Sequence, residues 1–360
     1  MSAAAATLPA LPPASPHTLV VGRTFLHPAV DYLLIGGGLS LVMAAAIALR
    51  ATRAPAPPAG VVLTSALPML IFVCNMAHFA ASTVRLYSRE GALARNPFLT
   101  MAFPLVSLAL LGLAIAFPQH LGAHLNALYF TWSPYHYAAQ AYGLAVMYCY
   151  RSSCPLRDTD KRWLRLACLP PFLLAFLSFP ASGLEWLVPP VAILEHPALH
   201  AARQVLRAGL IVLTFSAPAA LVLYFRRSAR SLPAISVLVI LANGIWWVVL
   251  PYFQAFVWVA VFHAVQYLAI TSIFHVNERL KSPGNRSAWW VHALSFYVRC
   301  LVLSYLLFQV LPLGYEAAGL GWAASSVLVV AAINIHHFIV DAYIWRLRKD
   351  PNYRVIESAA

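Results

Sequence analysis

The chain has 360 residues, of which 61% are hydrophobic and only 10% are charged. A soluble domain carries roughly 25% charged residues. This composition and a mean hydropathy of +0.75 therefore exclude an ordinary soluble fold and indicate a membrane protein. The formal net charge of +13 would suggest a nucleic-acid partner in a soluble protein, but basic cytoplasmic loops explain it here, so no nucleic acid is expected.

The N-terminal stretch is rich in alanine and proline. It lacks the basic start and the compact apolar segment of a signal peptide. We therefore predict a disordered tail over residues 1–28, a single transmembrane bundle domain over 29–346 and a cytoplasmic tail over 347–360.

Apolar stretches of about 20 residues follow the tail, each long enough to cross a hydrocarbon core of about 30 Å. Polar residues, prolines and glycines separate them. The predicted spans are 31–49, 61–83, 98–117, 126–150, 164–182, 205–225, 233–253, 256–276, 288–311 and 320–345. The predicted fold class is therefore all-α, a polytopic bundle of about ten transmembrane helices.

Lysine and arginine gather after every second predicted span. Arg85 and Arg89 follow the second span and Arg346 and Arg348 follow the tenth, whereas the loops after spans three, seven and nine contain neither residue type. Basic residues mark cytoplasmic loops. We therefore predict that both termini are cytoplasmic and that the chain is a multi-pass protein of a bacterial inner membrane.

Pairs of strongly polar residues recur in spans two, four, eight and ten. The motif Asn-x-x-His-Phe occurs at 75–79 and 334–338, and a histidine is followed by a glutamine at 136/140 and 263/266. Spacings of three or four residues place both members on one helix face. Such groups are costly in hydrocarbon, so these faces are expected to point into the bundle.

The polar groups also have similar predicted depths. At about 1.5 Å per residue, counting to the next basic residue places them roughly 10–23 Å from the cytoplasmic side. Four helices could therefore converge on one intramembrane pocket. Neutral imidazoles are the commonest protein metal ligands, so the expected metal ligands are His78, His136, His263, His336 and His337.

Other polar residues complete the expected site. Asp341, one turn after His337, is expected as a catalytic ligand or as the group that orients a ligand. Arg299 lies deep within span nine and is expected to act beside it by holding an anionic group. The expected substrate-binding residues are Asn75, Gln140, Gln266 and Asn334.

The doublet His336–His337 and the other intramembrane histidines resemble the membrane desaturases and hydroxylases in their type of chemistry. Those enzymes hold two irons with HxxxH and HxxHH boxes. Neither full box occurs here, so no ligand is assigned from the resemblance.

The leading hypothesis is a metal-dependent membrane oxidoreductase acting on a lipid-like or isoprenoid substrate. The metal is expected to be iron before copper or zinc, and the need for a separate electron donor stays open. No Walker A motif, glycine-rich dinucleotide fingerprint, HExxH or GxSxG motif occurs.

Two alternatives stay open. In a haem-binding electron-transfer or assembly protein, facing histidines would be axial ligands and Arg299 would hold a propionate. In a transporter or a scaffold, the polar residues would only pack helices, at about 0.6 kcal/mol for each hydrogen bond.

Overall fold

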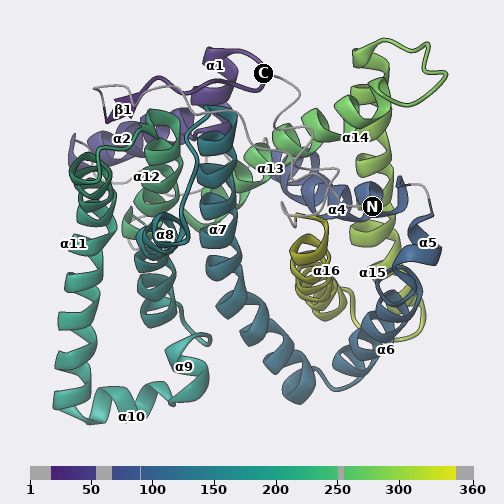
Figure 1. Cartoon of the computed structure of the whole chain (residues 1–360). Coiled ribbons are helices and arrows are strands. Elements are labelled where there is room, and N and C mark those ends of the chain that lie inside the picture. The colour runs from purple at the N-terminus through teal and green to yellow at the C-terminus, as the bar shows by residue number, and fades with distance from the viewer. Residues whose placement is uncertain (1–17, 54–66, 90, 250–254, 346–360) are drawn as a thin grey trace, which may run out of the picture.

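The computed structural model describes residues 18–53, 67–89, 91–249 and 255–345. Within these ranges the protein is almost entirely helical, and two short strands, β1 (Leu19–Val20) and β2 (Leu232–Pro233), pair in parallel at one end of the molecule (Figure 1). The all-α prediction is confirmed. Residues 1–17 of the predicted N-terminal tail and the whole predicted tail 347–360 lie outside the described residues.

The helices follow one another closely along the chain. The first six are α1 (Pro28–Val30), α2 (Gly38–Arg53), α3 (Leu67–Leu70), α4 (Ala77–Tyr87), α5 (Ala92–Arg95) and α6 (Phe103–Ala116). The next five are α7 (Ala123–Arg151), α8 (Asp158–Ser178), α9 (Leu184–Leu187), α10 (Pro190–Glu195) and α11 (Pro197–Arg227). The last five are α12 (Ala234–Val249), α13 (Ala255–Leu280), α14 (Trp289–Tyr305), α15 (Leu311–Ala317) and α16 (Trp322–Ile344). Wider π-helical turns extend several of them, at Asp31–Ile35, Ile71–Met76, Phe98–Ala102, Pro118–Gly122 and Leu306–Val310.

Six of the described helical stretches are long and apolar enough to cross a membrane. They are Pro68–Tyr87, Phe98–Ala116, Pro197–Arg227, Phe256–Leu280, Trp289–Ala317 and Trp322–Ile344. A seventh is added if the pair Pro28–Ile35 and Gly38–Ala46, bent by 54°, is one span. Each of the ten predicted spans contains helix among its described residues, but α7 carries several polar side chains, α8 begins with charged residues and α12 is short. The number ten therefore stays a prediction.

The long helices form two groups that meet at α7 and α16 (Figure 1). Helices α7, α8, α11 and α12 pack together on one side, and α4, α13, α14 and α16 pack together on the other. Contacts between α7 and α16, and between α12 and α13, join the groups. The four helices on which the sequence places paired polar residues, α4, α7, α13 and α16, therefore surround a common interior.

Asp31 ties the N-terminal stretch to the bundle. Its buried carboxylate accepts hydrogen bonds from the backbone N–H groups of Phe25, Leu26 and His27 and from the hydroxyl of Tyr148 on α7. A buried carboxylate is stable only when such donors surround it. Residues 18–27, which the sequence analysis assigned to the disordered tail, therefore fold against the bundle.

The substitution Asp31→Ala is expected to lower the free energy of unfolding by about 3 kcal/mol, because it leaves buried donors unpaired. Thermal unfolding in detergent measures the effect. Asp158→Ala is the matched control, because the Asp158 side chain is 81% exposed and its ion pair with Lys161 is a surface pair. Similar melting temperatures for the two variants would contradict the prediction.

Candidate metal centre

Four helices each bring one histidine to the same point in the interior. His78 of α4, His136 of α7, His263 of α13 and His337 of α16 are all buried. Their ring centroids are 4.8 Å apart for His78 and His337, 5.0 Å for His136 and His337, and 5.1 Å for His263 with either His78 or His136. We call these four residues the histidine cluster.

The Nε2 atoms of the histidine cluster are the chemically unusual feature. All four are buried, and none of them makes a hydrogen bond to any described residue. Buried polar atoms in proteins are nearly always paired. Four ring nitrogens without a hydrogen bond at one point therefore indicate a site built for something that binds nitrogen lone pairs.

Two of the rings are oriented through their other nitrogen. His78 Nδ1 lies 2.6 Å from the backbone carbonyl oxygen of Asn75, so this nitrogen donates its proton. His337 Nδ1 lies 3.0 Å from the hydroxyl of Ser82 on α4, and that hydroxyl already donates to the carbonyl of Phe79. Both rings therefore carry the proton on Nδ1 and present a bare lone pair at Nε2, which is the form that binds a metal ion.

Asp341 lies beside the histidine cluster, one turn after His337 on α16. Its Oδ2 atom is 3.5 Å from His337 Nε2 and 3.9 Å from His136 Nε2, and its Oδ1 atom accepts a hydrogen bond of 2.5 Å from the hydroxyl of Tyr267 on α13. Tyr267 in turn accepts a hydrogen bond from the indole N–H of Trp345. The carboxylate is thus held with one oxygen turned toward the imidazoles.

The spacing of these groups fits a metal ion. The potential ligand atoms of His78, His263 and His337 lie within 4.8 Å of one another, and so do those of His136, His337 and Asp341. Ligand atoms about 2.1 Å from an ion in a tetrahedral site are about 3.4 Å apart. In the second group, the distances of 3.5 and 3.9 Å from Asp341 Oδ2 to His337 Nε2 and His136 Nε2 are close to that spacing. His337 belongs to both groups.

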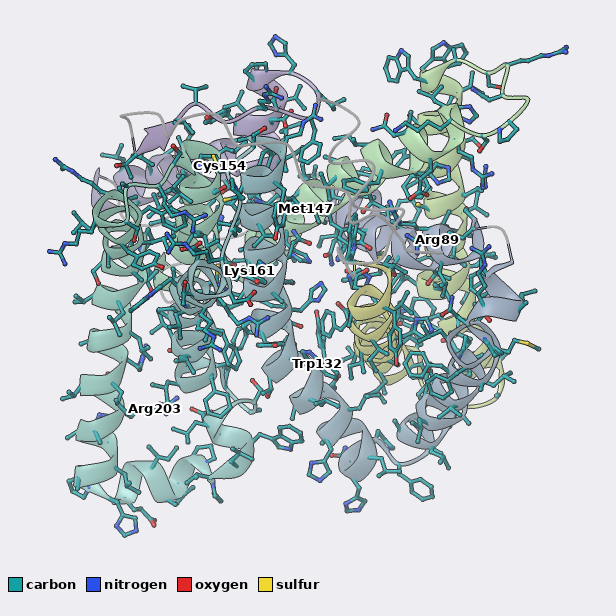
Figure 2. The ribbon with its side chains drawn as sticks, in the orientation of Figure 1. Arg89, Trp132, Met147, Cys154, Lys161 and Arg203 are labelled. Atoms are coloured by element: carbon teal, nitrogen blue, oxygen red, sulfur yellow. The ribbon has the colours of Figure 1, made fainter. Side chains whose placement is uncertain are left out.

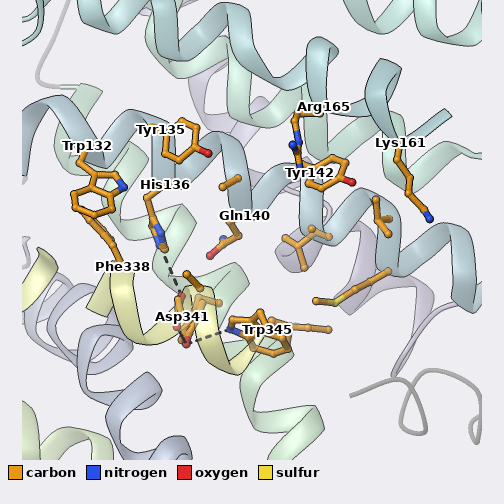
Figure 3. A pocket seen from close by; sticks show the side chains of 18 of the residues that line it. Trp132, Tyr135, His136, Gln140, Tyr142, Lys161, Arg165, Phe338, Asp341 and Trp345 are labelled. Atoms are coloured by element: carbon orange, nitrogen blue, oxygen red, sulfur yellow. Dashed lines mark hydrogen bonds and ion pairs between the residues drawn. The ribbon is translucent and has the colours of Figure 1, made fainter. Parts of the chain in front are cut away.

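A cavity of about 790 Å³ borders this site (Figure 3). His136, Asp341 and Tyr267 line it beside the histidine cluster. Most of the wall is apolar and aromatic and comes from α7 and α16: Trp132, Tyr135, Leu144, Met147, Phe338 and Trp345. Figure 2 shows Trp132 and Met147 at the side of α7 that faces α16. The volume is within the range of about 300–1,000 Å³ usual for small-molecule sites.

Three of the four predicted substrate-binding amides, those of Gln140, Gln266 and Asn334, donate hydrogen bonds to backbone carbonyls. Gln140 Nε2 donates to the carbonyl of His263 at 3.1 Å, and Gln266 Nε2 donates to the carbonyl of Ile35 at 2.9 Å. Asn334 donates to the carbonyl of Val330 within its own helix, and Asn75 supplies the carbonyl that orients His78. Of these four amides, Gln140 alone lines the large cavity.

The structure does not bring His336 or Arg299 to the site. Consecutive residues of a helix point about 100° apart, and the ring of His336 stacks on Phe103 of α6 with centroids 4.8 Å apart. Arg299 is exposed on α14, where its guanidinium donates to Ser295. Asp341 is bound by Tyr267, and its ion-pair and hydrogen-bond partners within the described ranges do not include Arg299.

Three residues of the site were not identified from the sequence. Tyr267 and Ser82 each follow a cluster histidine by four residues, so the same spacing that linked the other pairs could have identified them. Arg85, which the sequence analysis placed in a cytoplasmic loop, is fully buried in the last turn of α4. Its guanidinium pairs with Glu278 at 2.9 Å and lies 4.8 Å from the ring of Trp345.

Comparison of the chain with family models, with curated proteins and with solved structures gave no match. Function is therefore inferred from the histidine cluster, from Asp341 and from the adjoining cavity.

Proposed function

We propose that the protein is a metal-dependent integral membrane oxidoreductase acting on a lipid-like or isoprenoid substrate. The observation that carries this proposal is the set of four buried Nε2 atoms that form no hydrogen bond within the described chain. A scaffold would use buried histidines to bond neighbouring helices, and the Nε2 atoms would then have partners. Metal bound by the two groups of potential ligands, as one ion or as two, would give these atoms their partners.

Four imidazoles and one carboxylate form a ligand set that suits iron and also accommodates zinc or copper. We favour iron, because zinc has no redox chemistry of its own. Haem is less well supported, because the rings of His78 and His337 and those of His136 and His337 meet edge to face at 4.8 and 5.0 Å, which leaves no slot for a flat macrocycle between them.

The residues around the ion have separate tasks in this proposal. When bound, the ion supplies redox chemistry to the end of the cavity that His136 and Asp341 line. Tyr267 fixes Asp341 through one carboxylate oxygen, and Ser82 fixes the ring of His337. The apolar wall holds the substrate chain and excludes water from the reacting end.

The proposed membrane arrangement has about ten spans with both termini in the cytoplasm of a bacterial cell, forming one bundle domain. The six or seven helices that can cross a membrane and the basic residues after every second predicted span support this arrangement. The substrate then reaches the cavity from the lipid phase. A reaction that consumes electrons would also require a separate electron donor.

The test is the metal content and the activity of the protein purified in detergent. We expect one or two transition-metal ions per chain, and a chelator should remove them without unfolding the helices. Protein reloaded with ferrous iron, and supplied with dioxygen as oxidant and a chemical reductant as electron donor, should convert part of an extracted membrane-lipid mixture to oxidised products that mass spectrometry detects. Wild-type protein that binds no stoichiometric metal would contradict the proposal.

A further inference from the structure

The end of the large cavity remote from the histidine cluster is positively charged. Lys161 and Arg165 of α8 line it together with Tyr142 and Tyr150 of α7. The guanidinium of Arg165 lies 5.1 Å from the centre of the Tyr142 ring. Figure 3 shows Arg165 and Lys161 well separated from His136 and Asp341, with the apolar part of the cavity between them.

The charges along the cavity are unequally distributed. Asp341 is the one carboxylate among the lining residues, and it lies at the cluster end. At the other end, Lys161 pairs with the exposed Asp158 at 3.3 Å, outside the cavity lining. Arg165 forms no ion pair with any carboxylate in the described ranges. A guanidinium that lies against an aromatic face and makes no ion pair still has hydrogen-bond donors available for a ligand.

The distance between the two ends suits a long chain. Tyr142 and Tyr150 follow His136 on the same helix by six and fourteen residues, so the basic end lies roughly 9–21 Å from the cluster along α7. The wall between them includes Leu144, Val146, Met147 and Ile270 and is therefore apolar. Gly143 borders open space in the middle of the cavity, because a Cβ atom added there would meet no atom within 4 Å.

We propose that this cavity binds an amphiphile with one anionic head group, a carboxylate or a phosphate, held by Arg165 and Lys161 while its apolar chain extends toward the histidine cluster. As a statement about the substrate, this inference rests on the proposed oxidoreductase function. As a statement about binding, it needs only the cavity and its two cations, so it can be tested without metal.

The test compares three ligands with the same chain and different head groups. Oleate, oleyl phosphate and oleyl alcohol are titrated onto the metal-stripped full chain in nanodiscs of phosphatidylcholine. At least one anionic ligand should bind about ten-fold more tightly than the alcohol, because a charge-assisted hydrogen bond contributes about that much. Tighter binding of oleate would indicate a carboxylate substrate, and tighter binding of oleyl phosphate would indicate a phosphate substrate.

Variants at the basic end then assign the preference to these residues. The double variant K161Q/R165Q should bind acid, phosphate and alcohol equally. The matched control is R162Q, because Arg162 is an arginine on α8 that is exposed like Arg165 but does not line the cavity. If the double variant does not fold, R165E is used instead and should prefer oleylamine over oleate.

The outcomes separate this inference from the proposed function. Equal affinities for all three ligands in the wild type, or an unchanged preference in the double variant, would overturn the anionic head group even if the protein binds metal. A clear preference for an anionic ligand in a protein that never binds metal would overturn the oxidoreductase proposal and leave the binding site in place.

Discussion

A His337→Gln variant is expected to lose its metal, whereas a His336→Gln variant is expected to keep it. His337 belongs to both potential ligand groups and presents an unpaired Nε2 atom to them. His336 lies beside it in the chain but stacks on Phe103 of α6. Mutating residues that merely support metal ligands typically costs 10–100-fold in affinity, so the loss of a shared ligand should lower the metal affinity by more than about 100-fold.

The two variants make the same His→Gln change at neighbouring positions, so each controls for the effect of the other on folding. Both histidines lie in α16, and both have a buried Nε2 atom without a hydrogen-bond partner among the described residues. Any general loss of α16 packing should therefore appear in both. The measurement is the metal-to-protein ratio after purification and after reloading, with the melting temperature of each variant beside it. Equal metal contents for the two variants would rule out the histidine cluster as the metal site.

Much of the candidate site follows from helical spacing alone. The sequence pairs His136 with Gln140 and His263 with Gln266, and each pair shares a helix face because three or four residues make about one turn. Polar faces are costly in hydrocarbon and therefore turn inward. The structure accordingly brings together four of the five histidines that were expected as ligands, together with Asp341.

The structure differs from the sequence predictions where the sequence does not determine which face of a helix points inward or which residue a side chain contacts. A doublet such as His336–His337 contains no information on which ring faces inward, because this depends on how α16 packs on α4 and α7. Arg85 could equally face lipid head groups or Glu278, and only the tertiary structure pairs it with Glu278. The number of spans likewise does not follow from composition, because α7 is both polar enough to line a site and long enough to cross a membrane.

The substitution Gly143→Phe tests the cavity independently of the head group. Gly143 lines the cavity seven residues after His136, so it lies about 10 Å from the cluster along α7. A side chain there meets open space, and a phenyl ring should divide the cavity into two parts. Binding of oleate and of oleyl alcohol should both fall at least ten-fold, because neither chain can then extend from one end to the other.

The same substitution should leave folding and metal binding unchanged. Replacing a helical glycine by alanine normally gains about 0.5–1 kcal/mol of stability and phenylalanine gains less, while the added ring lies well away from the ligand atoms. Gly112→Phe on α6 is the matched control, because a Cβ atom there also meets no atom within 4 Å but the residue does not line the cavity. The measurement is the affinity of the wild type, Gly143→Phe and Gly112→Phe for oleate and for oleyl alcohol. Unchanged affinities in Gly143→Phe would show that long-chain ligands bind elsewhere. A loss of affinity for both the neutral and the anionic ligand would identify this cavity as the path by which an apolar chain reaches the histidine cluster.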